Sequence, residues 1–387
     1  MITKVYEGEW KGDKYEGRGV GYNDGGVKLY EGGVKGGVKN GKGSEYFESG
    51  ATRYHGSFVG GKRHGKGSEY FQNKGKRYIG EYSNGRRDGK GVEYYISGTK
   101  KYKGEFRLSK YHGKGVGFDE NGVKRYKGDY NEGRREGQGT EFYQNGVKRY
   151  EGAYKDSMRN GNGIGFDEMG VQGYEGWWEN GKPHGFGAEY YESGSKSYEG
   201  QWVESRYHGA GRIFDTKGHE VFNGTFMCGK KQGAGIEFYD TGEKRFSGIW
   251  RDDNLQGEVK EYYSNNNLKY SGDYENGVAQ GKGLAYWENG KLLYEGDCLN
   301  GLRHGQGKCY GENGVKKYSG GWTNGQREGF GIEYYENGLL GYEGFWRNGK
   351  AGGLGKEYDE GANLVYDGQW ENGHAEGYGR AYDDCEF

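Results

Sequence analysis

Most hydrophobic positions along this chain are aromatic, and they recur with a fixed spacing. An aromatic residue followed two positions later by glycine begins at Tyr6 and returns every 24 residues without a shift. A second aromatic position lies four residues after the first and lapses only at Val34 and Cys298, and a third begins at Tyr22 and is unbroken. Such a period is the signature of a repeat protein. The leading aromatic residues of the sixteen copies are Tyr6, Tyr30, Tyr54, Tyr78, Tyr102, Tyr126, Tyr150, Tyr174, Tyr198, Phe222, Phe246, Tyr270, Tyr294, Tyr318, Tyr342 and Tyr366.

The alternation within each copy predicts β-strands. Tyr6, Gly8 and Trp10 are two residues apart, so in an extended strand their side chains point to one face. A second short strand is expected over residues 19–23. Each copy is therefore predicted to form one β-hairpin.

Glycine and asparagine mark the expected connections. We expect the polar, glycine-rich segment 180–185 to form a loop within a copy, and residues 120–122 to form a tight turn between copies. Both segments contain Asn-Gly, which is the strongest short signal for a hairpin because both residues tolerate positive φ.

The glycine inside each aromatic triplet has a packing purpose. A ring from a neighbouring strand can lie over a position that has no β-carbon. Isolated hairpins are marginally stable, so the copies should stabilise one another through nearest-neighbour contacts. We expect one continuous array over residues 1–387.

Composition supports this picture and excludes others. Hydrophobic residues make up 31% of the chain, whereas it contains 85 glycines and 39 tyrosines. A thick aliphatic core is therefore excluded, and the 17% aromatic content argues against disorder. A single proline, Pro183, and the absence of glycine at every third residue exclude collagen.

Charge divides the chain into two portions. Residues 1–150 contain 31 basic and 19 acidic residues, whereas residues 151–387 contain 25 basic and 38 acidic ones. We also find neither a long apolar segment nor a leader peptide, and we expect a cytoplasmic protein. Four cysteines without paired spacing, expected to be free thiols, are Cys228, Cys298, Cys309 and Cys385.

The segment from Tyr174 to Gly187 resembles the MORN (membrane occupation and recognition nexus) repeat, through the pattern Tyr-Glu-Gly-x-Trp-x-Asn-Gly followed by Gly-x-Gly. The resemblance implies an all-β fold, an elongated single-layer twisted antiparallel sheet of sixteen tandem 24-residue β-hairpins. This period is one residue longer than is usual for the family, and Val259 interrupts Gly-x-Gly, which suggests an altered eleventh copy. Representative members of the structural aromatic columns are Tyr6, Trp10, Tyr22, Tyr174, Trp178 and Tyr190.

Catalytic, cofactor-binding and metal-binding residues are not predicted. Five histidines share one position of the repeat, so multiples of 24 residues separate them, and a shared metal ion is excluded. We expect the recurrent glutamate column that includes Glu45, Glu69 and Glu93 to face solvent. Because catalysis needs a unique desolvated group of residues, the sequence indicates that the protein is not an enzyme.

Basic pairs recur in copies three to seven and predict linear basic stripes. They are candidate contacts for an anionic partner, such as an acidic protein filament, an anionic lipid surface or nucleic acid, although a solvated face balanced by glutamates is an equal alternative. The candidates are Lys62, Arg63, Arg86, Arg87, Arg134, Arg135, Lys76, Arg77, Lys100, Lys101, Lys124, Arg125, Lys148 and Arg149.

The leading functional hypothesis is an interaction scaffold of a cytoskeletal assembly. Proteins made only of MORN repeats resemble components of ciliary axonemes, radial-spoke heads and cell cortices, so the expected location is a cilium or axoneme. Residues 1–5 and 383–387 are too short to cap the sheet, so self-association through its edges is a further expectation. The alternatives are a peripheral membrane tether that binds anionic phospholipids through residues 1–150, and a targeting module for an enzyme on another chain. Nucleic acid is the least favoured partner.

Overall fold

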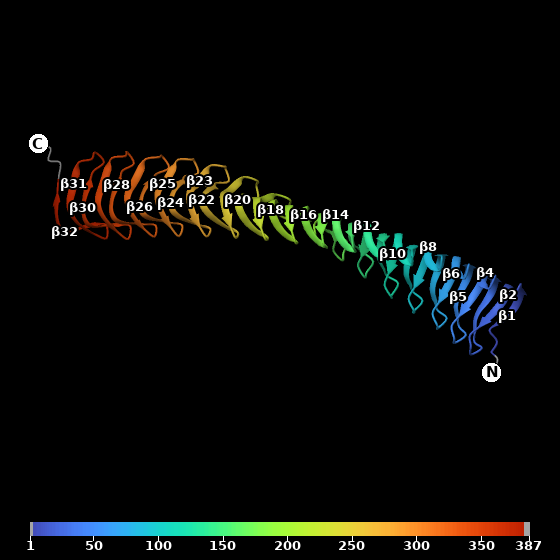
Figure 1. Ribbon diagram of the computed structural model, residues 1–387. Coiled ribbons are helices and arrows are strands. Elements are labelled where there is room, and N and C mark those ends of the chain that lie inside the picture. Colours follow the sequence, from blue (N-terminus) through green and yellow to red (C-terminus); the bar gives the residue numbers. More distant parts are fainter. Residues whose placement is uncertain (1–2, 383–387) are drawn as a thin grey trace. The chain divides into compact units, whose positions relative to one another are not determined.

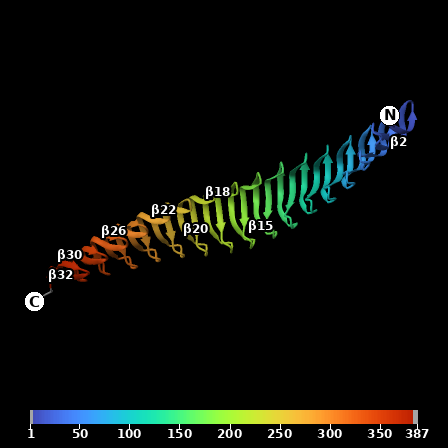
Figure 2. The ribbon, with the colours of Figure 1, turned by 90° about the horizontal axis from the view of Figure 1, so that it is seen from below.

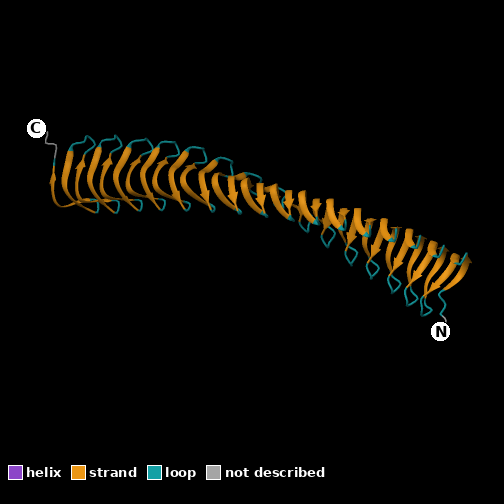
Figure 3. Cartoon of the chain, in the orientation of Figure 1, coloured by secondary structure: helices purple, strands orange, loops and turns teal. Residues whose placement is uncertain are grey.

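A computed structural model describes residues 3–382. In these residues the chain forms 32 strands, two from each copy of the repeat, and all paired neighbours run antiparallel. The all-β hairpin prediction is therefore confirmed (Figure 1, Figure 3). The chain contains two compact units, residues 1–194 and 195–387, and each unit forms a row of hairpins in one layer (Figure 2). The described part contains no helix that could span a membrane.

Within the first unit, strands that follow one another in the sequence pair side by side. The strands of this unit are β1 (Tyr6–Lys11), β2 (Lys14–Tyr22), β3 (Lys28–Lys35), β4 (Val38–Tyr46), β5 (Thr52–Val59), β6 (Lys62–Tyr70), β7 (Lys76–Ser83), β8 (Arg86–Tyr94), β9 (Lys100–Arg107), β10 (Lys110–Phe118), β11 (Lys124–Asn131), β12 (Arg134–Phe142), β13 (Lys148–Lys155), β14 (Met158–Phe166), β15 (Gln172–Glu179) and β16 (Lys182–Tyr190).

The second unit repeats this order of pairing. Its strands are β17 (Lys196–Val203), β18 (Arg206–Phe214), β19 (Glu220–Met227), β20 (Lys230–Phe238), β21 (Lys244–Arg251), β22 (Asn254–Tyr262), β23 (Leu268–Glu275), β24 (Val278–Tyr286), β25 (Leu292–Leu299), β26 (Leu302–Tyr310), β27 (Lys316–Thr323), β28 (Gln326–Tyr334), β29 (Leu340–Arg347), β30 (Lys350–Tyr358), β31 (Leu364–Glu371) and β32 (His374–Ala381).

The connections differ from the sequence-based prediction. Only Asn180 and Gly181 form the turn within the eighth copy, and the strand that follows already begins at Lys182. Both turn residues have positive φ, 49° and 84°, as a two-residue hairpin turn requires. The predicted loop 180–185 is therefore mostly strand, and the second strand of each copy is longer than expected.

The connections between copies are five-residue loops rather than tight turns. After β10, the Asp119 amide donates to the Val123 carbonyl, while the Asp119 carboxylate accepts from the amides of Asn121 and Val123. A tyrosine just after the second strand often ties one loop to the next, as when Tyr143 donates to the carbonyl of Phe166. Neighbouring loops are thus held together.

The hydrophobic core of each unit is a row of aromatic rings on one face of the sheet. Tyr54 is fully buried, and its ring meets the Phe58 ring of its own copy and the Tyr82 ring of the next copy edge to face, both at 5.2 Å. The same contacts recur along the first unit. Edge-to-face pairs add to the stabilisation from burial, so the rings replace an aliphatic core.

The leading ring covers two glycines that pair across its own hairpin. In the third copy Gly56 lies opposite Gly67, and a β-carbon on either glycine would overlap Tyr54. The ring over the triplet glycine therefore comes from the same strand, which corrects the expectation of a ring from a neighbouring strand. The ladder shifts register between Gly56 and Phe58, and the Tyr54 hydroxyl donates to the carbonyl of Ser57, three residues along the chain.

The eleventh copy is altered, as the sequence predicted. Val259 stands where a glycine faces Gly248, and its side chain is fully buried. A β-carbon on Gly248 would lie 3.0 Å from a methyl group of Val259. The valine thus occupies the space that a leading ring fills elsewhere, and Phe246 is only partly buried.

Candidate functional site

On the aromatic face, the residue nine positions after the leading ring covers that ring. Arg63 lies 4.4 Å from the centroid of Tyr54, and Arg87 lies 4.5 Å from that of Tyr78. In the fifth copy the position is Tyr111, which stacks on Tyr102 at 3.9 Å. A cation over a ring face is attracted by the ring quadrupole, and most copies carry arginine, lysine or tyrosine at this position, whereas the others carry proline, leucine or alanine.

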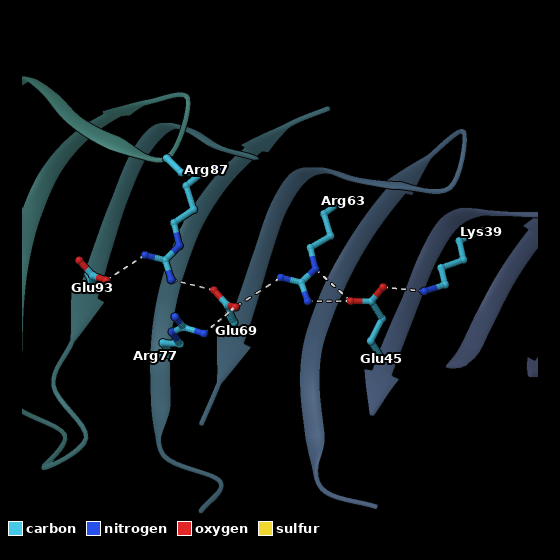
Figure 4. A network of polar contacts seen from close by, with 8 residues as sticks. Lys39, Glu45, Arg63, Glu69, Arg77, Arg87 and Glu93 are labelled. Carbon is cyan, nitrogen blue, oxygen red and sulfur yellow. Dashed lines mark hydrogen bonds and ion pairs between the residues drawn. The ribbon is translucent and has the colours of Figure 1, made fainter. Parts of the chain in front are cut away.

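The covering cations alternate with carboxylates from neighbouring copies, as Figure 4 shows. Arg63 reaches Glu45 of the preceding copy at 2.7 Å and Glu69 of its own copy at 3.5 Å. Arg87 repeats the arrangement, reaching Glu69 at 2.8 Å and Glu93 at 3.0 Å. This alternating row, which we call the ion ladder, joins copies two to four side by side.

Electrostatics of the ion ladder follow from its burial. Burial raises the pKa of Glu69, but the hydrogen bond from Arg87 and the charges of Arg87, Arg63 and Arg77 outweigh it, so the carboxyl titrates below its usual range. Glu69 is only 9% exposed, so the expectation that its column faces solvent is wrong there. Sequence reasoning missed that this column lies on the aromatic face. Burial raises the pKa of Tyr54 to about 12, so its hydroxyl stays protonated.

The basic pairs at the start of each second strand are divided between two environments. Their first members, Lys62, Arg86 and Arg134, are exposed, and Arg134 pairs with Asp156 at the surface. Their second members lie against the leading rings; these are Arg63, Arg87 and Arg135. The structure therefore leaves only the first member of each of these pairs open to a partner.

The basic pairs at the start of each first strand lie near the loops between copies. Arg77 and Arg149 reach down to the carboxylates Glu69 and Glu141, at 3.4 Å and 3.7 Å. Lys148 pairs with a neighbouring glutamate, and Lys124 lies over the Phe142 ring. The exposed members of this set are Lys76, Arg77, Lys100, Lys101, Lys148 and Arg149, and the half-buried ones are Lys124 and Arg125.

A basic column that sequence reasoning missed lies on the opposite face. It consists of the residue between the two glycines of each Gly-x-Gly motif. The second glycine faces the leading ring, so the residue just before it points to the opposite face. The signal was present in the sequence, in the middle position of a motif we read only for its glycines. In the first five copies this residue is exposed and basic: Arg18, Lys42, Lys66, Lys90 and Lys114.

The face opposite the rings is hollowed where the paired glycines expose backbone. In the first unit a groove of about 490 Å³ runs over Gly104, Gly115 and Gly128, with Lys103 and Lys114 among its walls. In the second unit a larger groove of about 690 Å³ covers the equivalent glycines of copies twelve to fourteen. Backbone forms the floor in both places, and the residues of the walls set the chemistry.

Near the C-terminal end of the second unit, the column opposite the rings becomes apolar. Phe330, Leu354 and Tyr378 occupy its last three positions and are 54%, 62% and 91% exposed. Phe330 contacts Phe345 edge to face at 5.9 Å, across neighbouring strands. Exposed hydrophobic side chains grouped in this way are typical of protein-interaction surfaces.

Within residues 3–382, no group of three or more histidine, cysteine, aspartate or glutamate side chains is arranged to hold a metal ion. Cys228, Cys298 and Cys309 are free thiols, and Cys298 and Cys309 are buried. The sequence also predicted a free thiol at Cys385 and a segment 383–387 too short to cap the sheet. Both lie outside the described residues.

Comparisons with solved structures add little. The crystal structure of TcdB2-TccC3-Cdc42 is 8% identical, over 92% of this chain and 25% of that one, with a TM-score of 0.14. A structure of the Photorhabdus luminescens Tc holotoxin pore is 12% identical, over 90% and 18% of the two chains, with a TM-score of 0.15. The chain thus spans a quarter or less of these proteins, and the scores are too low to carry an argument. A comparison with curated proteins gives no match.

The family comparison is decisive. The model described as the MORN repeat matches fifteen segments and leaves out the copy of Phe246 and Val259, the one whose ring packing is altered. The matched residues are 6–27, 30–52, 54–76, 78–100, 102–116, 126–148, 150–164, 174–196, 198–219, 222–244, 270–291, 294–316, 318–339, 342–361 and 366–383. Because these matches cover most of the sequence and begin at the leading rings of the hairpins, the chain belongs to the MORN repeat family.

Proposed function

We propose that the protein is a non-enzymatic scaffold of a cytoskeletal assembly, in a ciliary axoneme or at the cell cortex. MORN repeats indicate a protein- or membrane-interaction scaffold. The more specific proposal rests on one observation. Equivalent side-chain positions are exposed in successive copies, and contacts between neighbouring hairpins hold those positions in place. Ring contacts, ring-covering cations and loop hydrogen bonds hold neighbouring hairpins of the first unit against one another.

A scaffold binds through the surfaces that its own packing leaves free. Most leading rings are buried under neighbouring side chains, so the aromatic face as a whole offers little surface to a partner. What remains are the edges with their loops and the face opposite the rings, which is basic in the first copies and apolar at Phe330 and Leu354. Two chemically different surfaces on one chain suit a protein that joins unlike partners.

Detergent extraction tests the cytoskeletal proposal. Cells that express the protein are extracted with a non-ionic detergent, and an antibody follows the protein into the insoluble cytoskeleton or the dissolved membranes. We expect retention with the cytoskeleton, followed by crosslinking to identify the neighbours. Complete release with the membrane fraction would contradict the proposal.

A second candidate function is a peripheral membrane tether that binds anionic phospholipids. The observation that favours it is the basic column opposite the rings, in which Lys42, Lys66 and Lys90 are exposed and form no ion pair with any residue from 3 to 382. Each lysine near an anionic surface contributes about 1 kcal/mol, so several acting together give useful affinity.

Vesicle binding distinguishes the tether from the scaffold. Replacing the three lysines with glutamate should lower affinity for phosphatidylserine vesicles by about a hundredfold, and salt should weaken the wild-type interaction. The matched control carries the same change at three exposed lysines of the second unit that lie outside this column, Lys217, Lys244 and Lys260. Equal binding by both variants would remove the basic column from consideration.

A further inference from the structure

In the third and fourth copies, the chain's own arginines show how the aromatic face binds a guanidinium group. In the third copy Tyr54 lies directly between Glu45 and Glu69 on the two neighbouring strands. Arg63 stacks on the Tyr54 ring and reaches both carboxylates (Figure 4). In the fourth copy the ring is Tyr78, and Arg87 reaches a carboxylate on each side of it.

The fifteenth copy has the same arrangement of a tyrosine ring between two glutamates, but it lacks the arginine. Tyr342 lies directly between Glu333 and Glu357 on the neighbouring strands. The residue nine positions after this ring, which faces Trp346 across the hairpin as Arg63 faces Phe58, is Ala351. A methyl group therefore replaces the guanidinium side chain.

A cavity occupies the place that an arginine fills elsewhere. It measures about 510 Å³, and its walls include Glu333, Tyr342, Ala351 and Glu357. Tyr342 keeps 5% of its surface exposed, whereas Tyr54 under Arg63 keeps none. The space lies wholly within the second unit.

Two indoles fix the sides of this cavity. Trp346 and Trp370 meet the Tyr342 ring edge to face at 5.2 Å and 5.3 Å. Each indole N–H donates to a glycine carbonyl, that of Gly331 or Gly355, so both rings are held in position. The tyrosine face and two fixed walls form a preorganised slot for a flat cation.

The two carboxylates beside Tyr342 differ in their ion pairs. Glu333 already pairs with Arg327 at 2.7 Å, and Lys317 pairs with Glu336 at 2.8 Å. Glu357 has no hydrogen bond or ion pair from its side chain to any residue from 3 to 382. It differs in this from Glu45, Glu69 and Glu93 of the same column, each of which holds an arginine.

The remaining cation of the cavity does not close it. Lys350 is exposed at the start of its strand, in the position that Lys62 and Arg86 occupy next to their arginines. The two internal examples therefore accommodate a basic residue at this position together with a bound guanidinium group.

We propose that the cavity over Tyr342 is a binding site for an arginine side chain of a partner protein, with the guanidinium stacked on Tyr342 and hydrogen-bonded to Glu357. The inference adds a partner chemistry to the proposed scaffold, and it rests on that function only in taking the occupant to be a protein. Arginine is the occupant because both internal examples use its planar fork to bridge two carboxylates over a ring.

Titration of the purified full-length chain with N-acetyl-arginine amide tests the proposal. The indole N–H resonances of Trp346 and Trp370, in nitrogen-15 tryptophan-labelled protein, report occupancy. We expect saturable shifts in the millimolar range, with no response to N-acetyl-citrulline amide, which has the same shape without the charge.

Two variants locate the binding. Glu357→Gln should weaken the arginine probe by about tenfold, because a charged hydrogen bond is lost. Ala351→Arg should fill the cavity from within and abolish the response, and the third and fourth copies show that the fold accepts arginine there. The matched control is Ala279→Arg, which makes the same change over Tyr270 in the twelfth copy, where Glu261 lies beside the ring, and should leave the titration unchanged.

Several results would overturn the assignment. They are the absence of saturable shifts in the wild-type chain, binding that survives Ala351→Arg, loss of binding in the Ala279→Arg control, and equal affinity for N-acetyl-lysine amide. The titration uses only the purified chain, so a negative result would not contradict the cytoskeletal proposal. Release of the protein with membranes in the detergent extraction would not contradict the arginine site.

Discussion

At the residue scale, the paired glycines impose the strictest steric condition in the fold. Gly56 and Gly67 lie opposite one another, and the ring of Tyr54 lies against both. Where Val259 replaces the second glycine in the eleventh copy, the leading ring Phe246 is less buried than its equivalents in the other interior copies. A glycine is therefore needed for packing at this position and not only for turn geometry.

We expect Gly67→Ala to lower the free energy of unfolding by about 1–3 kcal/mol, because the added methyl group overlaps the buried Tyr54 ring. Urea denaturation followed by circular dichroism measures the change. Gly173→Ala is the control, since a β-carbon there would meet its nearest atom at 4.0 Å, and it should be close to neutral. Equal effects of the two substitutions would contradict this account of the ring contact.

The tyrosine hydroxyls make the fold sensitive to alkali. Burial raises the pKa of Tyr54, Tyr150 and Tyr318 to about 12, from an ordinary value of 10. A raised pKa means that the folded state favours the protonated hydroxyl. Its contribution to stability is complete below pH 10 and is lost as the pH rises towards 12.

We therefore expect the ultraviolet absorbance of these phenolates to appear together with the loss of β-sheet circular dichroism, at a pH above 10. Ionisation of the buried leading tyrosines at pH 10 with the sheet intact would show that folding does not protect their hydroxyls. A chemically unfolded sample provides the reference titration.

At the element scale, each hairpin depends on the copies beside it. Arg87 of the fourth copy holds a carboxylate in its own copy and another in the third, and Tyr54 of the third copy packs on Tyr82 of the fourth. A single hairpin would lose both kinds of contact, and isolated hairpins are only marginally stable in water. Stability is therefore a property of neighbouring pairs.

We expect Glu69→Gln to lower the free energy of unfolding by about 2 kcal/mol, because Arg63 and Arg87 lose a buried carboxylate. Chemical denaturation at neutral pH measures the effect. Glu132→Gln, which removes a surface pair with Lys110, should cost less than about 0.5 kcal/mol.

The same carboxylate predicts an acid dependence. The pKa of Glu69 is lowered below its ordinary value of 4.5, so its ionised form stabilises the fold above that pH and the contribution is lost as the pH falls through the lowered value. The wild-type chain should therefore lose stability below pH 4.5 more steeply than the Glu69→Gln variant. Parallel pH profiles for the two proteins would contradict the ion ladder.

At the scale of the whole molecule, the chain consists of two units whose surfaces differ. The face opposite the rings carries Lys42 and Lys66 in the first unit and Phe330 and Leu354 in the second. In a repeat protein the sequence can change one surface column gradually without disturbing the packing, because the two faces of a strand alternate. This freedom suits a scaffold with unlike partners.

We expect a fragment of residues 1–194 to fold by itself, because all its strands pair with sequence neighbours inside the fragment. Its urea m-value should be about half that of the full chain, since the m-value follows the surface exposed on unfolding. Circular dichroism and urea titration check this. An unfolded fragment would show that stability is not shared locally between neighbouring hairpins.

The sequence by itself determined the repeat, the hairpin of each copy and the family, because rings and glycines at fixed intervals allow only one periodic packing. It also identified the altered copy at Val259. It did not determine the strand bounds, because the two-residue Asn180-Gly181 turn lets pairing start at once and glycine-rich sequence then continues as strand.

Only the tertiary structure decided which charges are free. Arg63 and Lys62 are adjacent and equally basic in the sequence, but one lies over a ring between two carboxylates and the other is exposed. Likewise Glu357 belongs to the same column as Glu69, but no cation among the described residues pairs with it. Arg63 and Glu45 are 18 residues apart in the sequence, and strand register, which the linear pattern does not contain, brings the two side chains together.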